Sequence, residues 1–201
     1  MTAKVRDVLQ TYWGTSVFRT GQYEAVSAVI DRCDCLVVLP TGGGKSLCYQ
    51  LPALLIPGVC VVISPLIALM NDQVEGLQKK GIRAMHLSGP MKEEDLVREL
   101  DNCKFGNFKF LYLSPERAQH PLVQTQLSQM QLSLLAIDEA HCISEWGHDF
   151  RPSYRKIISL KKWLSDIPTI AVNASATAAV REDICHSFEL RSPAEVGRSG
   201  Y

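Results

Sequence analysis

The clearest structural signal in the chain is the stretch Leu39-Pro40-Thr41-Gly42-Gly43-Gly44-Lys45-Ser46. It follows a short apolar run over 35–38 and precedes a segment with a helical pattern over 46–55. Three successive glycines allow positive φ angles and bring backbone N–H groups close to phosphate oxygens. The following helix adds the positive end of its dipole. The order of strand, glycine-rich turn and helix predicts a polyphosphate-binding loop; the alternative is a glycine-rich surface turn.

Two side chains at the end of this loop have predicted roles. Lys45 is expected to reach the β- and γ-phosphates, and the Ser46 hydroxyl is expected to join the coordination shell of Mg²⁺. The strict pattern G-x-x-x-x-G-K-[ST] asks for glycine where this chain has Leu39. The remaining backbone contacts would come from Thr41, Gly42, Gly43 and Gly44.

Bulk composition limits the class of protein. The 201 residues suffice for one α/β domain, and the 46% hydrophobic and 21% charged content is ordinary for a globular protein. Because 21 basic residues balance 21 acidic ones, nucleic-acid binding would need a local patch. There is no run of about 18 apolar residues and no apolar signal-peptide core. We therefore expect a cytoplasmic protein with no membrane partner.

The cysteines indicate reduced thiols. Their odd count, their scatter and the lack of an export signal argue against a disulfide framework. Cys33 and Cys35 form a close pair, but no second pair with metal-ligand spacing follows, so core or strand thiols are favoured and no zinc site is expected. The seven residues are Cys33, Cys35, Cys48, Cys60, Cys103, Cys142 and Cys185.

Apolar runs and helical patterns alternate along the chain. This alternation predicts one domain with a mostly parallel central sheet and helices on both faces, a three-layer α/β fold. The helix over 65–80 is expected to turn Leu66 inward. Strands are expected at 35–38, 59–63, 83–87, 110–113, 132–137 and 169–172, and the other helices at 3–13, around 22–30, and at 46–55, 91–102, 122–130, 151–164 and 177–188.

Ligands of such sheets bind at the carboxyl ends of the strands, where this chain places polar residues. The strand over 132–137 runs directly into Asp138 and Glu139. Behind a phosphate loop, Asp138 is expected to hold Mg²⁺ opposite Ser46, and Glu139 to polarise the water that attacks the γ-phosphate. The alternative is a helix start with two acids near its positive end.

An aromatic segment follows these acids. The run over 142–152 combines large apolar side chains with turn-forming residues, and its Trp146, His148, Phe150 and Arg151 suit stacking against unpaired bases better than core packing. Earlier in the chain, the amide of Gln22 would suit the edge of an adenine, although the residues alone favour a polar helix-start residue there.

Taken together, these motifs resemble the RecQ family of DNA helicases, in helicase superfamily 2. The resemblance covers about 18–188, and its last motif, which joins a DEAH box to an aromatic-rich loop, is the most specific. The motifs that carry it are Phe18-Arg19-x-Gly21-Gln22, the loop over 39–50, Ser64-Pro65-Leu66-Ile67-Ala68-Leu69-Met70-x-Asp72-Gln73-Val74, and Asp138-Glu139-Ala140-His141-Cys142-Ile143-Ser144-x-Trp146-Gly147-His148-Asp149-Phe150-Arg151-Pro152.

The resemblance implies the first RecA-like domain, a P-loop NTPase, of an ATP-dependent 3′–5′ DNA helicase in repair or recombination. Such a protein uses ATP and Mg²⁺, binds single-stranded and partly duplex DNA, and works in the nucleoid or the nucleus. Catalysis would rest on Glu139 and Lys45, and Mg²⁺ on Ser46 and Asp138. ATP would also contact Arg19, Gln22, Thr41, Gly42, Gly43 and Gly44. Contacts to DNA, or coupling to it, would come from Ser64, Pro65, Trp146, His148, Phe150, Arg151, Ser175 and Thr177.

The resemblance also sets an expectation about domains. We assign 1–190 to the ATP-binding domain and 191–201 to a flexible tail or truncation point. In the family a second RecA-like domain supplies an arginine finger, worth about 10³–10⁵ in rate, so little hydrolysis or unwinding is expected without it. The alternatives are a non-catalytic nucleotide- or DNA-binding fragment and an RNA helicase of the same superfamily.

Overall fold

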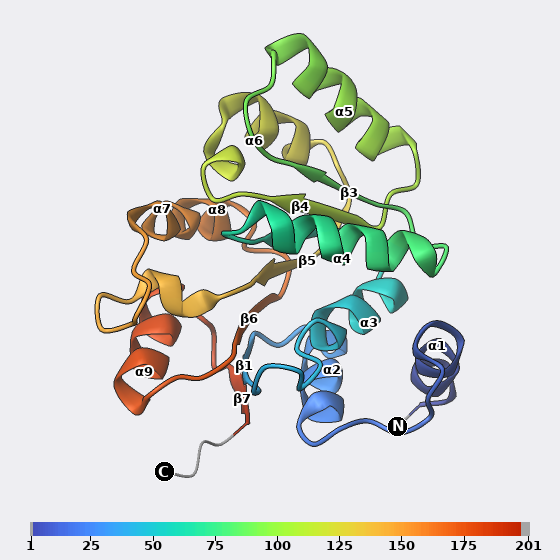
Figure 1. Cartoon of the computed structure of the whole chain (residues 1–201), viewed down its shortest axis with the longest axis vertical. Helices are drawn as coiled ribbons and strands as arrows, with labels where there is room; N and C mark the ends of the chain where they lie inside the picture. Colours follow the sequence, from blue (N-terminus) through green and yellow to red (C-terminus); the bar gives the residue numbers. More distant parts are fainter. Residues whose placement is uncertain (1, 198–201) are drawn as a thin grey trace.

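The alternating pattern builds a seven-stranded sheet in the computed structural model, which describes residues 2–197 (Figure 1). The strand order is β3-β4-β2-β5-β6-β1-β7, and every pairing between these strands is parallel. The fold prediction is confirmed. The strands are β1 (Cys35–Val38), β2 (Val59–Ile63), β3 (Ala84–Leu87), β4 (Phe110–Leu113), β5 (Leu132–Ile137), β6 (Thr169–Asn173) and β7 (Ala194–Val196).

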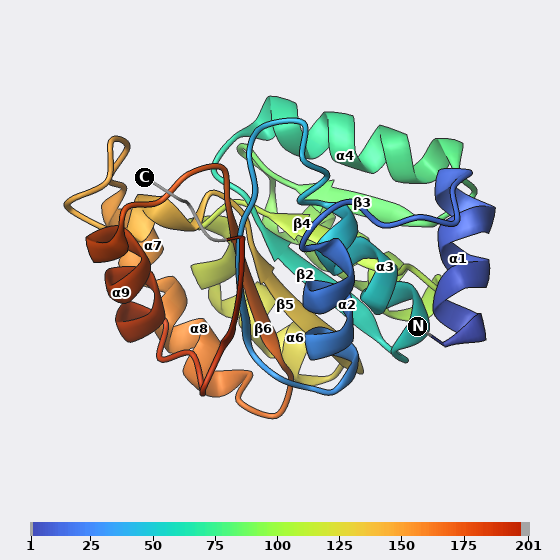
Figure 2. The ribbon, with the colours of Figure 1, turned by 90° about the horizontal axis from the view of Figure 1, so that it is seen from below.

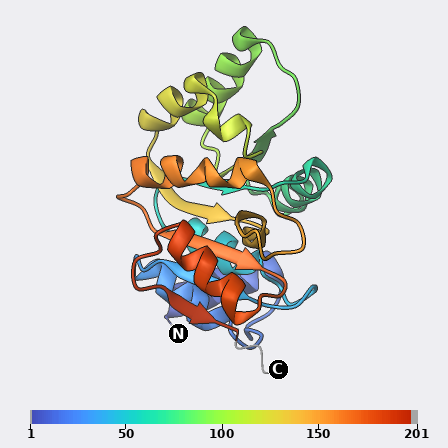
Figure 3. The same ribbon diagram turned by 90° about the vertical axis from the view of Figure 1, so that its left-hand side faces the viewer.

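Helices cover both faces of the sheet (Figures 2 and 3). One face packs against α2 (Gln22–Ile30), α3 (Leu47–Leu55) and α4 (Ile67–Lys79). The other packs against α5 (Glu93–Phe105), α6 (Pro121–Ser128), α7 (Pro152–Arg155), α8 (Ile157–Trp163) and α9 (Ala178–Ser187). Helix α1 (Ala3–Trp13) lies outside α2 and α3 and packs against them in a third, smaller core. Two short 3₁₀ turns, η1 (Arg117–Gln119) and η2 (Ala140–Ile143), complete the described elements.

The central strands are buried on both faces, which explains their continuous apolar sequence. Every residue of β1, β2, β4 and β6 is buried. Alternate residues divide between the two cores: Leu36 and Val38 face α9 and its neighbours, whereas Cys35 and Val37 face α2 and α3. In residues 2–197, no helix is long and apolar enough to cross a membrane.

Two helices differ from the prediction. The helix expected over 151–164 is broken at Lys156 into α7 and α8. Helix α4 begins at Ile67 with Leu66 as its N-cap, so Leu66 is not turned inward. Leu66 and Ile67 are each 48% exposed, which places two apolar side chains on the surface just after β2.

The prediction of a flexible tail from residue 191 is wrong for 194–196. These residues form the edge strand β7, which pairs with β1 and aligns Ala194 with Cys35. Gly197 then follows at φ +84°, so close to β1 that a Cβ there would lie 1.8 Å from the carbonyl oxygen of Val38. Three residues are too few for a strand pattern to be recognised in sequence. Residues 198–201 of the expected tail lie outside the described part of the chain.

A buried carboxylate connects several elements at the amino ends of strands β1 and β6. Asp34, 3% exposed, precedes β1 and accepts hydrogen bonds from the backbone N–H groups of Thr169 (2.8 Å) and Arg191 (2.7 Å). The Nζ of Lys161 on α8, itself buried, lies 3.4 Å from the same carboxylate. This cluster joins the starts of β1 and β6 to α8 and to the segment that leads into β7.

We predict that Asp34→Ala lowers the free energy of unfolding by about 3 kcal/mol, because it leaves two backbone donors without their acceptor and the buried Lys161 ammonium with the Glu189 carbonyl but no counter-charge at Asp34. Urea denaturation measures this loss. Asp166→Ala, an exposed acid near the same end of the strands, is the control and should change stability by less than about 0.5 kcal/mol. Equal stability of the two variants would contradict the role assigned to Asp34.

Candidate functional site

The predicted site residues meet at the carboxyl edge of the sheet. The glycine-rich loop follows β1, Ser64 follows β2, Asp138 follows β5, and Ser175 lies two residues beyond β6. Because the strands are parallel and β5, β6 and β1 are neighbours, these segments leave the sheet on the same side (Figure 1).

The glycine-rich loop is shaped to receive an anion. Gly42 and Gly44 have φ angles of +78° and +77°, and a Cβ on Gly44 would lie 2.3 Å from the side-chain nitrogen of Gln22. Within residues 2–197, the backbone N–H groups of Gly44, Lys45 and Ser46 have no hydrogen-bond acceptor. The Ser46 side chain does not cap α3 either. The loop therefore presents free donors at the positive end of a helix.

Gln22 braces this loop from behind. It is 3% exposed, and its Nε2 donates to the carbonyl oxygens of Gly43 (3.3 Å) and Gly44 (3.1 Å). Its Oε1 accepts from the backbone N–H of Arg19 (2.9 Å), whose guanidinium donates to the carbonyl of Gly42. The structure thus brings Arg19 and Gln22 to the loop. The Gln22 amide is engaged there and does not face the neighbouring cavity.

We predict that Gln22→Ala weakens Mg²⁺–ATP binding by up to about 30-fold, because two hydrogen bonds of about 1 kcal/mol each no longer hold the loop. Titration with a fluorescent ATP analogue measures the change. Gln78→Ala is the matched control, since the Gln78 amide on α4 also donates to a backbone carbonyl, that of Ala84 at the start of β3 and not one in the loop. An affinity equal to that of the control would show that the loop keeps its shape without Gln22.

A cavity of about 560 Å³ opens beside the loop, next to Arg19. Its volume lies in the range of small-molecule sites. The segment formed by β7 and Gly197 makes one wall, so residues expected to be flexible contribute to the site. The lining residues are Arg19, Thr20, Gly21, Glu24, Val38, Leu39, Pro40, Gly43, Glu195, Val196 and Gly197.

Asp138 is buried beneath this edge. It is 8% exposed, and its Oδ1 accepts from the backbone N–H of Glu139 at 2.9 Å. Burial and the negative charge of Glu139 raise the pKa of Asp138 to about 6, and the positive charge of Lys45 acts in the opposite direction. The Tyr154 hydroxyl donates to the Asp138 carbonyl at 2.8 Å and fixes the strand exit. Together with the uncommitted Ser46 hydroxyl, this carboxylate offers the oxygen ligands that Mg²⁺ prefers.

Glu139 has a left-handed backbone, with φ +48° and ψ +47°. This conformation costs a non-glycine residue about 1 kcal/mol or more, and such strain gathers at functional sites. Its side chain is about a quarter exposed, and Oε2 lies 3.3 Å from Nδ1 of His141. The carboxylate is therefore both oriented and accessible, as a group that positions water must be.

Sequence reasoning missed Asn173, the last residue of β6. Asn173 is fully buried; its Oδ1 contacts Nδ1 of His141, and its Nδ2 donates to the carbonyl of Ser175. It connects the acidic segment after β5 to the segment after β6. The available signal was an asparagine directly after the predicted strand over 169–172, at the sheet end where the site residues gather.

The aromatic segment is built differently from a simple stacking surface. Trp146 is 81% exposed, whereas Phe150 is half-buried with the Arg155 guanidinium 5.1 Å from its ring centroid. His148 stacks on His141 with centroids 4.4 Å apart. Arg151 binds the Asp149 carboxylate (3.0 Å) and donates to the Pro65 carbonyl (3.3 Å), linking this segment to the start of α4. Of the four predicted residues, Trp146 and His148 are exposed, and Trp146 presents its large ring to solvent.

Two predicted DNA-contact residues differ from the expectation: Ser64 is buried, and the exposed Thr177 uses its hydroxyl as a helix cap. Ser64 is 1% exposed, and among the described residues its Oγ has no hydrogen-bond partner. Thr177 uses its Oγ1 to accept from the Val180 N–H and cap α9 (3.3 Å), while Ser175 is exposed. Beside Pro65 the surface instead carries a cavity of about 420 Å³, lined by Pro65, Ile67, Gly89, Ser114, Glu116, Arg117 and His120.

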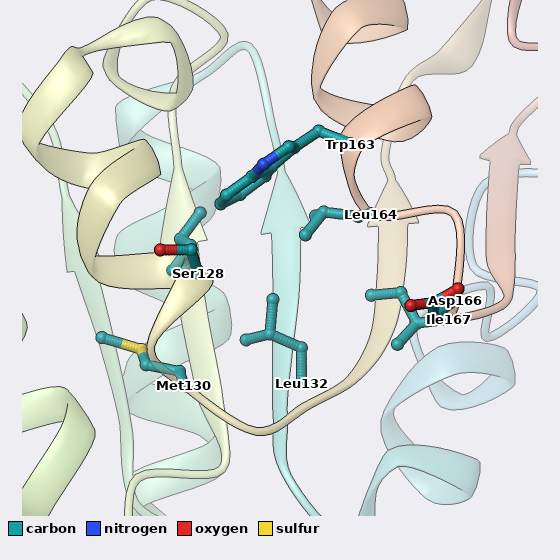
Figure 4. Close-up of a pocket in the computed structure, with 8 residues that line it drawn as sticks. Ser128, Met130, Leu132, Trp163, Leu164, Asp166 and Ile167 are labelled. Carbon is teal, nitrogen blue, oxygen red and sulfur yellow. The ribbon is translucent and has the colours of Figure 1, made fainter.

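A further cavity of about 300 Å³ lies at the other end of the strands, near the amino ends of β5 and β6. Figure 4 shows Trp163, Leu164 and Ile167 facing Met130 and Leu132 across it. Because the phosphate loop and the two acids leave the strands at their carboxyl ends, this cavity is separate from the candidate site.

The sequence matches known helicases over most of its length. Residues 19–184 match the DEAD/DEAH box helicase family. The chain is 44% identical to the ATP-dependent DNA helicase RecQ of Bacillus subtilis over 193 residues, which is 95% of this chain and 33% of that protein. It is 42% identical to the probable ATP-dependent DNA helicase RecS of the same organism, covering 94% of this chain and 38% of that one. The chain spans about a third of the length of these relatives.

Solved structures agree on the fold. The helicase domain of Hef from Pyrococcus furiosus superposes with a TM-score of 0.67 at 21% identity, covering 94% of this chain and 39% of that one. The helicase MrfA, solved bound to DNA and AMPPNP, superposes with a TM-score of 0.73 at 20% identity over 100% of this chain and 29% of that one. With the family match over 19–184 and the RecQ relatives in sequence, the chain belongs to the DEAD/DEAH box helicase family.

Proposed function

We propose that this chain is the ATP-binding half of an ATP-dependent 3′–5′ DNA helicase of the RecQ type. One observation carries the proposal: the glycine-rich loop and the Asp138–Glu139 pair lie at the same edge of the sheet, close enough for Lys45 to stabilise the Asp138 carboxylate. The names of the sequence relatives support DNA, rather than RNA, as the nucleic acid.

The residues divide the work of phosphoryl transfer. Lys45 and the free N–H groups of the loop bind the phosphates, while Arg19 lines the cavity assigned to the base. Ser46 and Asp138 would hold Mg²⁺, which neutralises the phosphate charge when bound. Glu139 then orients the attacking water and accepts its proton.

The DNA contacts are assigned to the same edge. Trp146 offers an exposed ring for base stacking, and Pro65, His148, Phe150, Arg151 and Ser175 accompany it. The Ser64 side chain is buried and that of Thr177 caps α9, so these two residues would contact DNA through their backbone groups. A role in repair or recombination, and a location in the nucleoid or the nucleus, follow from the RecQ resemblance.

The 201-residue chain by itself is expected to bind ATP with little or no hydrolysis. In this family a second RecA-like domain supplies an arginine to the transferring phosphoryl group, with an effect of about 10³–10⁵ on rate. Adding the second domain of a RecQ relative in trans should therefore raise the rate. A chain that binds ATP but gains nothing from that domain would be a binding module.

Nucleotide binding tests the proposal directly. We expect Lys45→Ala to weaken binding of a fluorescent ATP analogue with Mg²⁺ by at least about tenfold, because a charge-assisted contact to phosphate is lost. Lys79→Ala, a change to an exposed lysine on α4, should leave the affinity unchanged. Equal affinities would overturn the assignment of the phosphate loop. Competition between single-stranded DNA and RNA tests the choice of nucleic acid, and preference for RNA would contradict it.

A further inference from the structure

Three potential metal ligands converge at the base of the aromatic segment. They belong to His141, Cys142 and Asp149, and one ligand atom of each residue lies within 4.8 Å of the other two. The Cys142 sulfur is 3.9 Å from His141 Nε2 and 3.9 Å from Asp149 Oδ2. Ligands of tetrahedral zinc lie about 3.3–3.7 Å apart, given bonds of about 2.0–2.3 Å, so small side-chain movements would close the site.

The surroundings of His141 fix the tautomer that a metal requires. Its Nδ1 faces two acceptors, Oδ1 of Asn173 and, at 3.3 Å, Oε2 of Glu139. The Asn173 amide is oriented by the bond from its Nδ2 to the Ser175 carbonyl. Nδ1 therefore carries the hydrogen, and the Nε2 lone pair points toward Cys142. In zinc sites, the nitrogen of the imidazole that does not bind the metal usually donates to an oxygen acceptor in this way.

From this geometry we infer that His141, Cys142 and Asp149 form a binding site for a zinc-class divalent cation, with water completing the coordination. Imidazole, thiolate and carboxylate together suit Zn²⁺ or Co²⁺ and not Mg²⁺. The site is distinct from the magnesium position assigned to Ser46 and Asp138. The sequence indicated no zinc site because it contains no second pair of cysteines with metal-ligand spacing. In the fold, Asp149, seven residues beyond Cys142, supplies the third ligand.

Two features of the cluster must change when the cation binds. The buried Cys142 thiol must release its proton to solvent, because the thiolate is the form that binds the cation. Arg151 already bonds Oδ2 of Asp149 through Nη2 (3.0 Å) and Nε (3.2 Å). Oδ2 is also the oxygen that lies 3.9 Å from Cys142 Sγ, so the carboxylate would rotate to give Oδ1 to the cation while Oδ2 keeps its bonds to Arg151.

A cation here would join the two ends of the segment that carries Trp146. Cys142 lies in η2 on the buried side, and Asp149 lies on the exposed side seven residues later. Occupancy would close this loop and hold Trp146 in a narrower range of positions. The cation would also bind His141, whose other ring nitrogen contacts Glu139. The cluster is thus placed to regulate the proposed coupling of DNA to hydrolysis, although cation binding itself does not depend on that function.

Cobalt titration of the 201-residue chain tests the inference. We expect a thiolate-to-cobalt band in the near ultraviolet, with visible bands typical of tetrahedral cobalt, both removed by Zn²⁺ and unaffected by excess Mg²⁺. Cys142→Ser should abolish the thiolate band. Asp149→Asn, a surface change that leaves the fold intact, should weaken cobalt binding by at least about tenfold.

Cys33→Ser is the matched control, because Cys33 is the exposed thiol and also has an acid nearby in sequence. Its bands should equal those of the wild type. Circular dichroism checks that each variant is folded. No thiolate band in the wild type, or full cobalt affinity in Asp149→Asn, would overturn the site. So would bands lost in Cys33→Ser. Slower hydrogen exchange over 144–150 on adding Zn²⁺ is expected as the independent readout.

Discussion

Glu139→Gln is expected to lower the rate of ATP hydrolysis by about 10²–10⁴-fold while leaving Mg²⁺–ATP affinity within a few-fold of the wild type. The substitution keeps the size of the side chain and its ability to accept from the protonated Nδ1 of His141. It removes the carboxylate that orients the attacking water and accepts its proton. The loss should therefore fall on the chemical step and not on binding.

The measurement is steady-state hydrolysis with a second RecA-like domain supplied, together with nucleotide binding by fluorescence. Glu145→Gln serves as the matched control, because Glu145 is an exposed acid of the same region that pairs with Arg155. We expect its rate to stay within about twofold of the wild type, as surface pairs contribute little. A Glu139→Gln rate equal to that of the control would show that another group positions the water.

Trp146→Ala is expected to abolish the stimulation of hydrolysis by single-stranded DNA and to leave ATP affinity near normal. The ring is 81% exposed, seven residues beyond Glu139, and its backbone N–H is held by the Ser144 hydroxyl (3.2 Å). Stacking of one base on such a ring is worth about 1–3 kcal/mol, so DNA affinity should fall by about 5- to 150-fold.

Trp163→Ala is the control for this change. Trp163 is 46% exposed but lines the cavity at the other end of the strands (Figure 4), so its loss should not affect DNA stimulation. Hydrolysis is measured across a range of DNA concentrations, which separates weaker binding from lost coupling. Full stimulation of Trp146→Ala at saturating DNA would contradict the coupling role.

The fold could be predicted because its determinants are local. Apolar runs such as β2 and β6, separated by amphipathic helices, leave few arrangements other than a parallel sheet covered on both faces. The family match over 19–184 agrees with the motifs that carried the resemblance. Strand β7 was missed because three residues have no period, and it forms only through its pairing with β1.

Residue placement at the site was less predictable. The motifs located the loop and the acids. They could not show that the Gln22 amide donates to the carbonyls of Gly43 and Gly44. Nor could they show that Ser64 is buried. These outcomes depend on contacts between distant segments, which the spacing of residues along the chain does not encode. The link from His141 through Asn173, 32 residues later, is of the same kind.

The central claim, that the loop and the acids form one ATP site needing a partner domain, is tested most directly by steady-state ATP hydrolysis. The 201-residue chain is assayed with and without single-stranded DNA, with Lys45→Ala as the background, alongside Mg²⁺–ATP binding. We predict a rate at background despite measurable binding, and a Lys45-dependent rate once a second RecA-like domain is added. A DNA-stimulated, Lys45-dependent rate from the chain alone would contradict this account, because the site would then complete itself without an added arginine.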